Sequence, residues 1–168
     1  KAASVFVVKS AAMRPVILRL ETADGVTGIG EATVCYGVGA SAAAAMIVEM
    51  CERFVLGAEE SRIEFIWSQI YDHSFWTKGG GAISFAALSA IEQALWDIKG
   101  KRLGVPVYEM LGGRVHDRLR AYANGWCMGT STVDEFLKAA EMPLRDGFKA
   151  IKCYPLASTD AAGRRQHI

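Results

Sequence analysis

The fold of this chain is decided by residues 84–113, which read SFAALSAIEQALWDIKGKRLGVPVYEMLGG. Large apolar side chains recur in the first half of this stretch at the spacing of one helix face, namely Leu88, Ile91, Leu95 and Ile98. We therefore predict a helix from Ser84 to about Lys99, ended by Gly100. Pro106 then opens a short helical turn, which Gly112 and Gly113 close.

The N-terminal segment predicts an antiparallel meander of about three strands. A β-branched and aromatic run at residues 5–8 reads as one strand, and apolar and polar residues alternate along residues 16–21. Asp24 and Gly25 suit a two-residue hairpin turn, after which residues 26–31 return as a further strand.

Two more helices are expected between the meander and the long helix. Ser41 can cap a helix that runs until Gly57. Ser61, with Glu64 three residues later, makes a capping box for the next helix. Residues 77–81, which read TKGGG, are then expected to form a flexible loop.

The pattern after the long helix changes to strand, helix and strand. Residues 119–123 read as a strand, Thr132 and Glu135 form a capping box for a helix, and residues 148–154 read as the next strand. This order is a βαβ unit, which is typical of a parallel sheet or barrel. Pro143 falls inside the helix, where we expect it to kink the helix or end it early.

The change of pattern predicts two domains. An α+β domain, an antiparallel meander plus helices, is expected over residues 1–112. The βαβ unit belongs to a second domain over residues 113–168, and the boundary lies near residues 112–118.

Charge, hydropathy and cysteine spacing exclude several classes of protein. The 168 residues carry a formal net charge of +1 without a basic block, which argues against nucleic-acid binding. No apolar run approaches the roughly 20 residues of a membrane span. The four cysteines lie far apart without a CxxC pair, which is neither zinc-site spacing nor a disulfide scaffold. We expect a reduced, cytoplasmic compartment.

Two further patterns are not functional motifs. Gly28-Ile29-Gly30 is not a dinucleotide fingerprint, because no helix opens at the third glycine position. Glu92 and Asp97 lie on a helix flanked by cations, so we expect them on a solvated face rather than as a carboxylate pair.

Three separated stretches together resemble one known family. They are LRLETADGVTGIGE at residues 18–31, the stretch 84–113 quoted above, and GFKAIKCY at residues 147–154. Their order and spacing resemble the mandelate racemase/muconate lactonizing enzyme branch of the enolase superfamily, and residues 89–113 resemble its galactonate-dehydratase-like acid-sugar dehydratases. This resemblance, which covers nearly all of the chain, implies a capping domain over residues 1–112. It also implies the first βαβ unit of an incomplete (β/α)7β TIM-like barrel over residues 113–168.

The resemblance also implies a function and a cofactor. Intact relatives are Mg²⁺-dependent lyases that remove the α proton of an acid sugar and expel the β hydroxyl as water, and a homo-oligomer is expected. A complete barrel needs about 200–250 residues, of which this chain supplies roughly 50. The family's metal-binding carboxylates lie on later barrel strands, so no metal ligand is expected here. A racemase, epimerase or cycloisomerase is the alternative reaction, and a non-catalytic capping-domain remnant is the alternative from another class.

Lys152 and Tyr154 are the candidate catalytic residues. Strand alternation puts both on one face, with Cys153 on the other. The family often has Lys-x-Lys here, whereas this chain reads Lys152-Cys153-Tyr154, so the second lysine is missing. Tyr154 could act as an acid or base, since a nearby ammonium lowers the pKa of a phenol. The alternative is that Lys152 only binds the substrate carboxylate and that Tyr154 lines the pocket.

Five residues are candidates for substrate binding. Asn124 and Trp126 follow the first predicted barrel strand, where active-site loops begin. Tyr36, Trp76 and Lys78 lie on capping-domain loops that correspond to substrate-approaching regions in the family. For each of them the alternative is an ordinary loop or packing role.

Overall fold

The computed structural model describes residues 1–9, 13–34 and 36–153. The chain divides into two compact units, of which unit 1 comprises Lys1–Arg114 and unit 2 begins at Val115.

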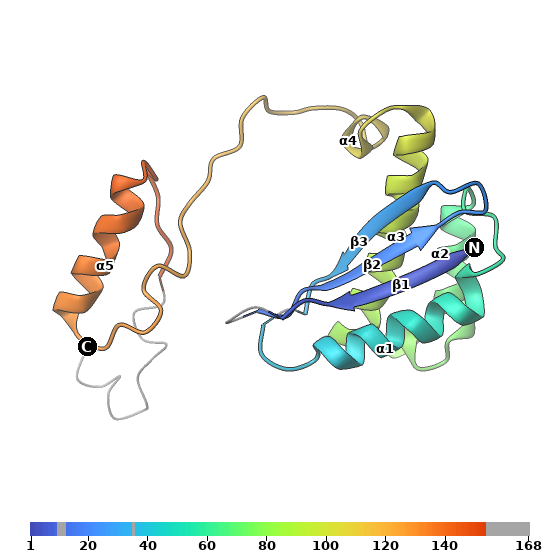
Figure 1. The fold of residues 1–168 in the computed structure, drawn as a ribbon, viewed down its shortest axis with the longest axis horizontal. Coiled ribbons are helices and arrows are strands. Elements are labelled where there is room, and N and C mark those ends of the chain that lie inside the picture. Colours follow the sequence, from blue (N-terminus) through green and yellow to red (C-terminus); the bar gives the residue numbers. More distant parts are fainter. Residues whose placement is uncertain (10–12, 35, 154–168) are drawn as a thin grey trace. The chain divides into compact units, whose positions relative to one another are not determined.

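Unit 1 is built on a three-stranded antiparallel sheet with the order β1-β2-β3. Figure 1 shows β1 (Ala2–Val7), β2 (Val16–Glu21) and β3 (Thr27–Ala32) side by side, with β2 in the middle. Alternation puts Val16, Leu18 and Leu20 of β2 on the buried face. The predicted meander is therefore confirmed, although its first strand lies a few residues earlier than expected.

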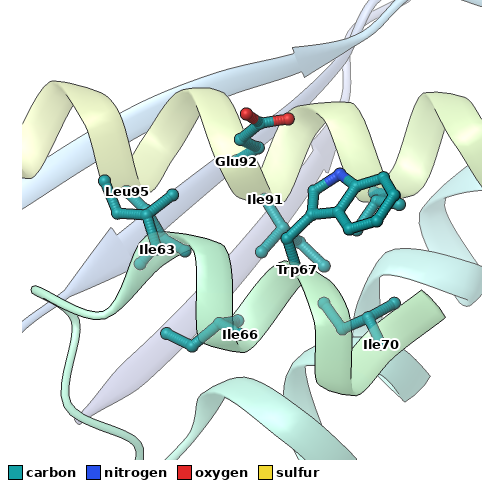
Figure 2. Close-up of a pocket in the computed structure, with 8 residues that line it drawn as sticks. Ile63, Ile66, Trp67, Ile70, Ile91, Glu92 and Leu95 are labelled. Carbon is teal, nitrogen blue, oxygen red and sulfur yellow. The ribbon is translucent and has the colours of Figure 1, made fainter. Parts of the chain in front are cut away.

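Two helices of unit 1, α1 (Ala40–Met50) and α3 (Ala82–Leu103), pack on the buried face of this sheet. The π-helical continuation of α1, η1 (Cys51–Val55), leads to α2 (Ile63–His73), which packs against η1 and α3. Figure 2 shows α2 beside α3, with Ile63 next to Leu95, and Ile66, Ile70 and Ile91 line the same small pocket. These side chains belong to one continuous apolar core, whose burial is the main stabilising term for such a domain.

Two predicted helix caps are wrong. Gly39 occupies the N-cap position of α1 instead of Ser41, and Arg62 occupies that of α2 instead of Ser61. Neither N-cap makes a side-chain capping bond, and the Ser61 hydroxyl donates to Glu59 Oε1 at 2.6 Å. Both helix starts are set by the packing of their apolar faces, which overrides the local capping preference.

The predicted end of the long helix at Gly100 is also wrong, because α3 runs on to Leu103. Its C-cap is Gly104, whose φ of 67° is the left-handed conformation that ends many helices. Gly100 is buried, and a Cβ there would lie 2.8 Å from the carbonyl oxygen of Val105. Gly100 thus allows close packing rather than chain reversal. The predicted short turn forms as α4 (Val107–Met110).

Close contact between β3 and α3 explains the spaced glycines of β3. A Cβ at Gly28 would overlap the carbonyl oxygen of Ala94, and one at Gly30 would overlap that of Ala90. The two glycines therefore let the helix backbone lie directly against the strand.

Side chains of α3 also bind the free edge of β3. The bonds join Ile29 N to Asp97 Oδ2 at 2.8 Å, Glu31 N to Gln93 Oε1 at 3.1 Å and Lys101 Nζ to Thr27 O at 2.8 Å. Asp97, which was expected on a solvated face, is partly exposed there and also binds this strand edge. This edge is satisfied by a helix in the place of a fourth strand.

Unit 2 contains α5 (Val133–Arg145), which begins with the predicted capping box. Glu135 N donates to Thr132 Oγ1 at 3.2 Å, and Thr132 N donates to Glu135 Oε2 at 3.3 Å. The helix continues past Pro143, so the predicted early end is wrong. Pro143 lies in the last turn and is buried, so the single backbone bond that it cannot donate is a limited loss.

The two strands predicted in unit 2 are reduced to one parallel bridge, between Ala123 and Ile151, within the residues that the structure describes. Ala123 N donates to Ala150 O at 3.0 Å, and Lys152 N donates to Ala123 O at 2.8 Å. Leu119 is 84% exposed. Parallel strands are stable when both faces are covered, and no such cover exists within the described part of unit 2. Tyr154 lies outside the described residues.

Candidate functional site

Three loops of unit 1 meet at one end of the sheet. Because Gly28 faces Ala94 and Gly30 faces Ala90, α3 runs antiparallel to β3. The start of α3 therefore lies where β3 ends, and the loop from β3 to α1 leaves from the same place.

Two contacts tie the loops together at this end. Met13, in the β1–β2 loop, forms an antiparallel bridge with Tyr36, in the loop after β3. Ile83, in the first turn of α3, lies 3.1 Å from the position of a Cβ on Gly39. Tyr36 itself is 73% exposed, so its ring is available to a molecule bound at this end.

The loop between α2 and α3 presents Trp76 and Lys78. A short 3-10 turn, η2 (Thr77–Gly79), occupies part of the segment predicted to be a flexible loop. Thr77 is buried, and its N–H donates to Ser74 O at 2.7 Å. This anchored turn leaves Trp76 85% exposed, while Lys78 Nζ lies 3.2 Å from Asp72 Oδ1.

Phe75 belongs to the same surface but was missed in the sequence. It is 78% exposed, and its ring packs edge-on against Trp76 with the centroids 5.1 Å apart. Two adjacent exposed aromatic rings make this loop a candidate binding surface. The signal was the pair Phe75-Trp76 just after a helix end, where no apolar stripe requires either ring.

The opposite end of unit 1 carries an ionic cluster with a structural role. Arg102 donates two bonds of 2.9 Å to the Asp24 carboxylate and lies 2.6 Å from Glu60 Oε1. These bonds hold the pKa of Asp24 well below its ordinary value. A cavity of about 210 Å³ at this end is lined by apolar side chains and the ion pair of Lys1 with Glu21. The cluster ties the β2–β3 hairpin to the segment before α2.

In unit 2, Asn124, Trp126 and Lys152 all follow the parallel bridge. They therefore lie at the carboxyl ends of the bridged segments, where barrel enzymes carry their active sites. Asn124 is exposed, and its Oδ1 accepts a 3.0 Å bond from Gly125 N. Lys152 is partly buried.

Trp126 is only 8% exposed and packs against Phe136 of α5, with ring centroids 4.8 Å apart. Its indole Nε1 is buried without a hydrogen-bond partner within the described chain. In this arrangement its ring has a packing role, and only the N–H remains for another group.

The described residues do not assemble a metal site. No group of three or more histidine, cysteine, aspartate or glutamate side chains lies close enough to hold an ion in residues 1–9, 13–34 and 36–153. Asp24, Glu60 and Asp97 are instead engaged with Arg102, Lys101 or backbone groups. Nor does any helix in the described part have the length and apolar character to cross a bilayer.

The sequence matches one protein family, described as mandelate racemase / muconate lactonizing enzyme, N-terminal domain, over residues 3–112. Similar proteins include a D-galactonate dehydratase of Verminephrobacter eiseniae, 42% identical over 72% of this chain and 30% of that protein. A D-galactonate dehydratase of Xanthomonas campestris pv. campestris is 47% identical over 67% of this chain and 28% of that protein.

Solved structures are similar over almost the whole chain. A Mesorhizobium loti protein provisionally described as a dehydratase is 54% identical, with a TM-score of 0.92 over 97% of this chain and 45% of that one. A member of the enolase superfamily from Salmonella Typhimurium is 36% identical, with a TM-score of 0.83 over 96% of this chain and 43% of that one. The chain thus spans less than half the length of these proteins.

Proposed function

This chain belongs to the mandelate racemase / muconate lactonizing enzyme family, and we propose that it is the N-terminal part of an acid-sugar dehydratase. Residues 1–112 are the capping domain and residues 113–168 begin the barrel. Because the chain spans 28–30% of the two D-galactonate dehydratases above, the activity is proposed for a protein that also carries the rest of the barrel.

The observation that carries this proposal is the surface of loops at one end of unit 1. Tyr36, Phe75 and Trp76 present exposed rings there, and aromatic faces suit the C–H faces of a sugar chain. Lys78 supplies a cation for the substrate carboxylate, since its pair with Asp72 is half exposed and can exchange. The relatives named D-galactonate dehydratase support a sugar acid as the substrate class.

The proposed reaction breaks the C–H bond next to the carboxylate and then the C–O bond at the β carbon. A base takes the α proton, the electron pair moves into the new C=C bond, and the β hydroxyl leaves with a proton as water. The resulting enol becomes a 2-keto-3-deoxy acid. Lys152 is the proposed base or carboxylate-binding group and Tyr154 its proposed acid/base partner, while Asn124 and the Trp126 N–H face substrate hydroxyls.

In a whole protein of this kind Mg²⁺ would stabilise the negative charge that develops on the substrate carboxylate. We place none of its ligands among the described residues, which do not fit an ion. The metal would therefore depend on the remainder of the barrel.

The test uses the product of the complete reading frame that contains these residues. With Mg²⁺ and a panel of acid sugars, we expect a 2-keto-3-deoxy acid, detected as its semicarbazone. Lys152→Ala should reduce kcat by about 10²-fold or more, whereas Lys149→Ala, an exposed neighbour, should leave it unchanged. If the substrate were racemised or epimerised and no keto acid formed, the dehydratase proposal would be wrong and the racemase or epimerase alternative would take its place.

A further inference from the structure

The cavity of about 210 Å³ in unit 1 has an apolar floor and an open mouth. Its walls come from the first residues of the chain, the end of β2, the segment after η1 and one side of α3. The floor consists of buried core side chains, namely Leu20, Val55, Leu95 and Ile98. Leu56 and Gly57, which also line the cavity, are exposed, so a molecule can enter from solvent.

The size and lining of this cavity suit an organic group better than water. A cavity of about 150 Å³ already holds a benzene ring, whereas a buried water needs about two to four polar partners. The side chains of the floor supply no such partner. Water over the floor is therefore poorly bound, and an apolar group gains free energy by displacing it.

The backbone that forms one wall of the cavity is irregular. Leu56 N donates to Cys51 O at 2.9 Å, which is the wide bond of a π-helical turn. Gly57 follows with a φ of 84°, in the left-handed region, and reverses the chain. Single π-helical turns are rare and occur frequently at functional sites. Here the turn holds Val55 in the floor and leaves the next residues at the mouth.

The charged groups beside the cavity carry an excess of negative charge. Glu60 lines the cavity, and its Oε1 lies 2.6 Å from Arg102. The same guanidinium donates to both carboxylate oxygens of Asp24 at 2.9 Å. One cation therefore serves two carboxylates, and Oε2 of Glu60 remains an acceptor for a further donor. Glu21, which also lines the cavity, is paired with Lys1 at 2.6 Å.

We propose that this cavity is a binding site for a small primary ammonium compound with an aromatic or short aliphatic body. The body lies on the apolar floor, and the ammonium group at the mouth donates to Glu60 Oε2. An anionic ligand is disfavoured, because it would bring a third negative charge beside Asp24 and Glu60. The site lies at the opposite end of unit 1 from the loops that carry Tyr36 and Trp76, so it does not depend on the proposed activity.

Titration of the ¹⁵N-labelled 168-residue chain with benzylammonium, followed by NMR, tests the proposal. The amides of Thr22, Ala23, Gly57 and Ala58 should shift saturably, with a Kd of about 1 mM for a ligand of so few atoms. The amide of Trp76 should not shift. Benzyl alcohol, which has the same body without the charge, should bind about fivefold more weakly, and benzoate should cause no shift at these amides.

Two variants separate the roles of the carboxylate and the floor. Glu60→Gln keeps the shape of the side chain and should weaken benzylammonium binding to the level of benzyl alcohol. Glu59→Gln is the matched control, since the Glu59 carboxylate accepts from Ser61 at 2.6 Å and does not line the cavity. Val55→Phe places a ring in the floor and should abolish the binding of both compounds.

Circular dichroism shows whether each variant is folded, and if Val55→Phe is not, the comparison of Glu60→Gln with Glu59→Gln decides. The proposal would be overturned if benzylammonium caused no saturable shift at the four amides. Benzoate binding as tightly as benzylammonium, or Glu60→Gln binding benzylammonium as well as the parent chain does, would also overturn it.

Discussion

The two units of this chain differ in how completely they bury their apolar residues. In unit 1, Leu18 and Ile70 are fully buried and Leu95 is 2% exposed, and they belong to one core between sheet and helices. In the described part of unit 2, only Trp126 and Pro143 are buried, while Leu137 and Leu144 of α5 are 61% and 60% exposed. Unit 1 has the core of an independent domain, whereas the described part of unit 2 is held by local bonds and buries few apolar side chains.

The largest expected effect compares one leucine from each unit. Leu95→Ala removes a buried side chain from the centre of unit 1 and should lower the free energy of unfolding by about 2–5 kcal/mol. Leu137→Ala removes an exposed side chain from α5 and should change it by less than about 0.5 kcal/mol. Urea denaturation followed by circular dichroism measures both. Equal losses would mean that unit 2 contributes a core of its own.

A smaller effect is expected where unit 2 depends on a local bond. Thr132→Ala removes the N-cap of α5 and should destabilise that helix by about 1 kcal/mol. The helical signal of α5 should fall while the cooperative unfolding of unit 1 keeps its midpoint. Ser61→Ala, which removes a serine that does not cap its helix, is the matched control. If Thr132→Ala shifted the unfolding midpoint of unit 1, the stabilities of the two units would be coupled, contrary to this prediction.

The smallest effect concerns the surface ionic cluster of unit 1. Arg102 lowers the pKa of Asp24 in the folded state, so the stabilisation is present above the ordinary aspartate pKa of about 4 and is lost as pH falls below it. The Tm of the parent chain should therefore fall more steeply between about pH 4 and pH 2 than that of Asp24→Asn. If Tm fell equally steeply with pH in both proteins, the ion pair of Asp24 would not contribute to the acid sensitivity of unit 1.

The parts of the fold that sequence alone predicted are those set by local patterns. The alternation of Val16, Leu18 and Leu20 determined the buried face of β2, and the Thr132 capping box began α5 as expected. The helix end predicted at Gly100 was wrong because a glycine can mark either chain reversal or close packing. Only the close approach of the Val105 carbonyl oxygen shows that Gly100 serves packing. The N-caps predicted at Ser41 and Ser61 were wrong because packing of the apolar faces, and not side-chain capping, sets where these helices begin.

In the candidate site too, some features follow from local sequence and others depend on the tertiary fold. The loops that carry Tyr36, Trp76 and Lys78 could be recognised from their positions between predicted elements. That they meet at one end depends on α3 running antiparallel to β3, which no single segment reveals. Phe75 was missed although the pair Phe75-Trp76 follows a helix end, because the exposure of its ring depends on the anchored turn at Thr77.

The central claim has two parts: residues 1–114 fold as an independent capping domain, and residues 115–153 depend on cover from outside the described chain. Hydrogen exchange of the 168-residue monomer, measured residue by residue, tests both parts. The amides of β2 and of α3 around Leu95 should exchange only through global unfolding. The amides of α5 and of the Ala123–Lys152 bridge should exchange far faster, through local opening. Equally strong protection of both units in a monomer would contradict the claim.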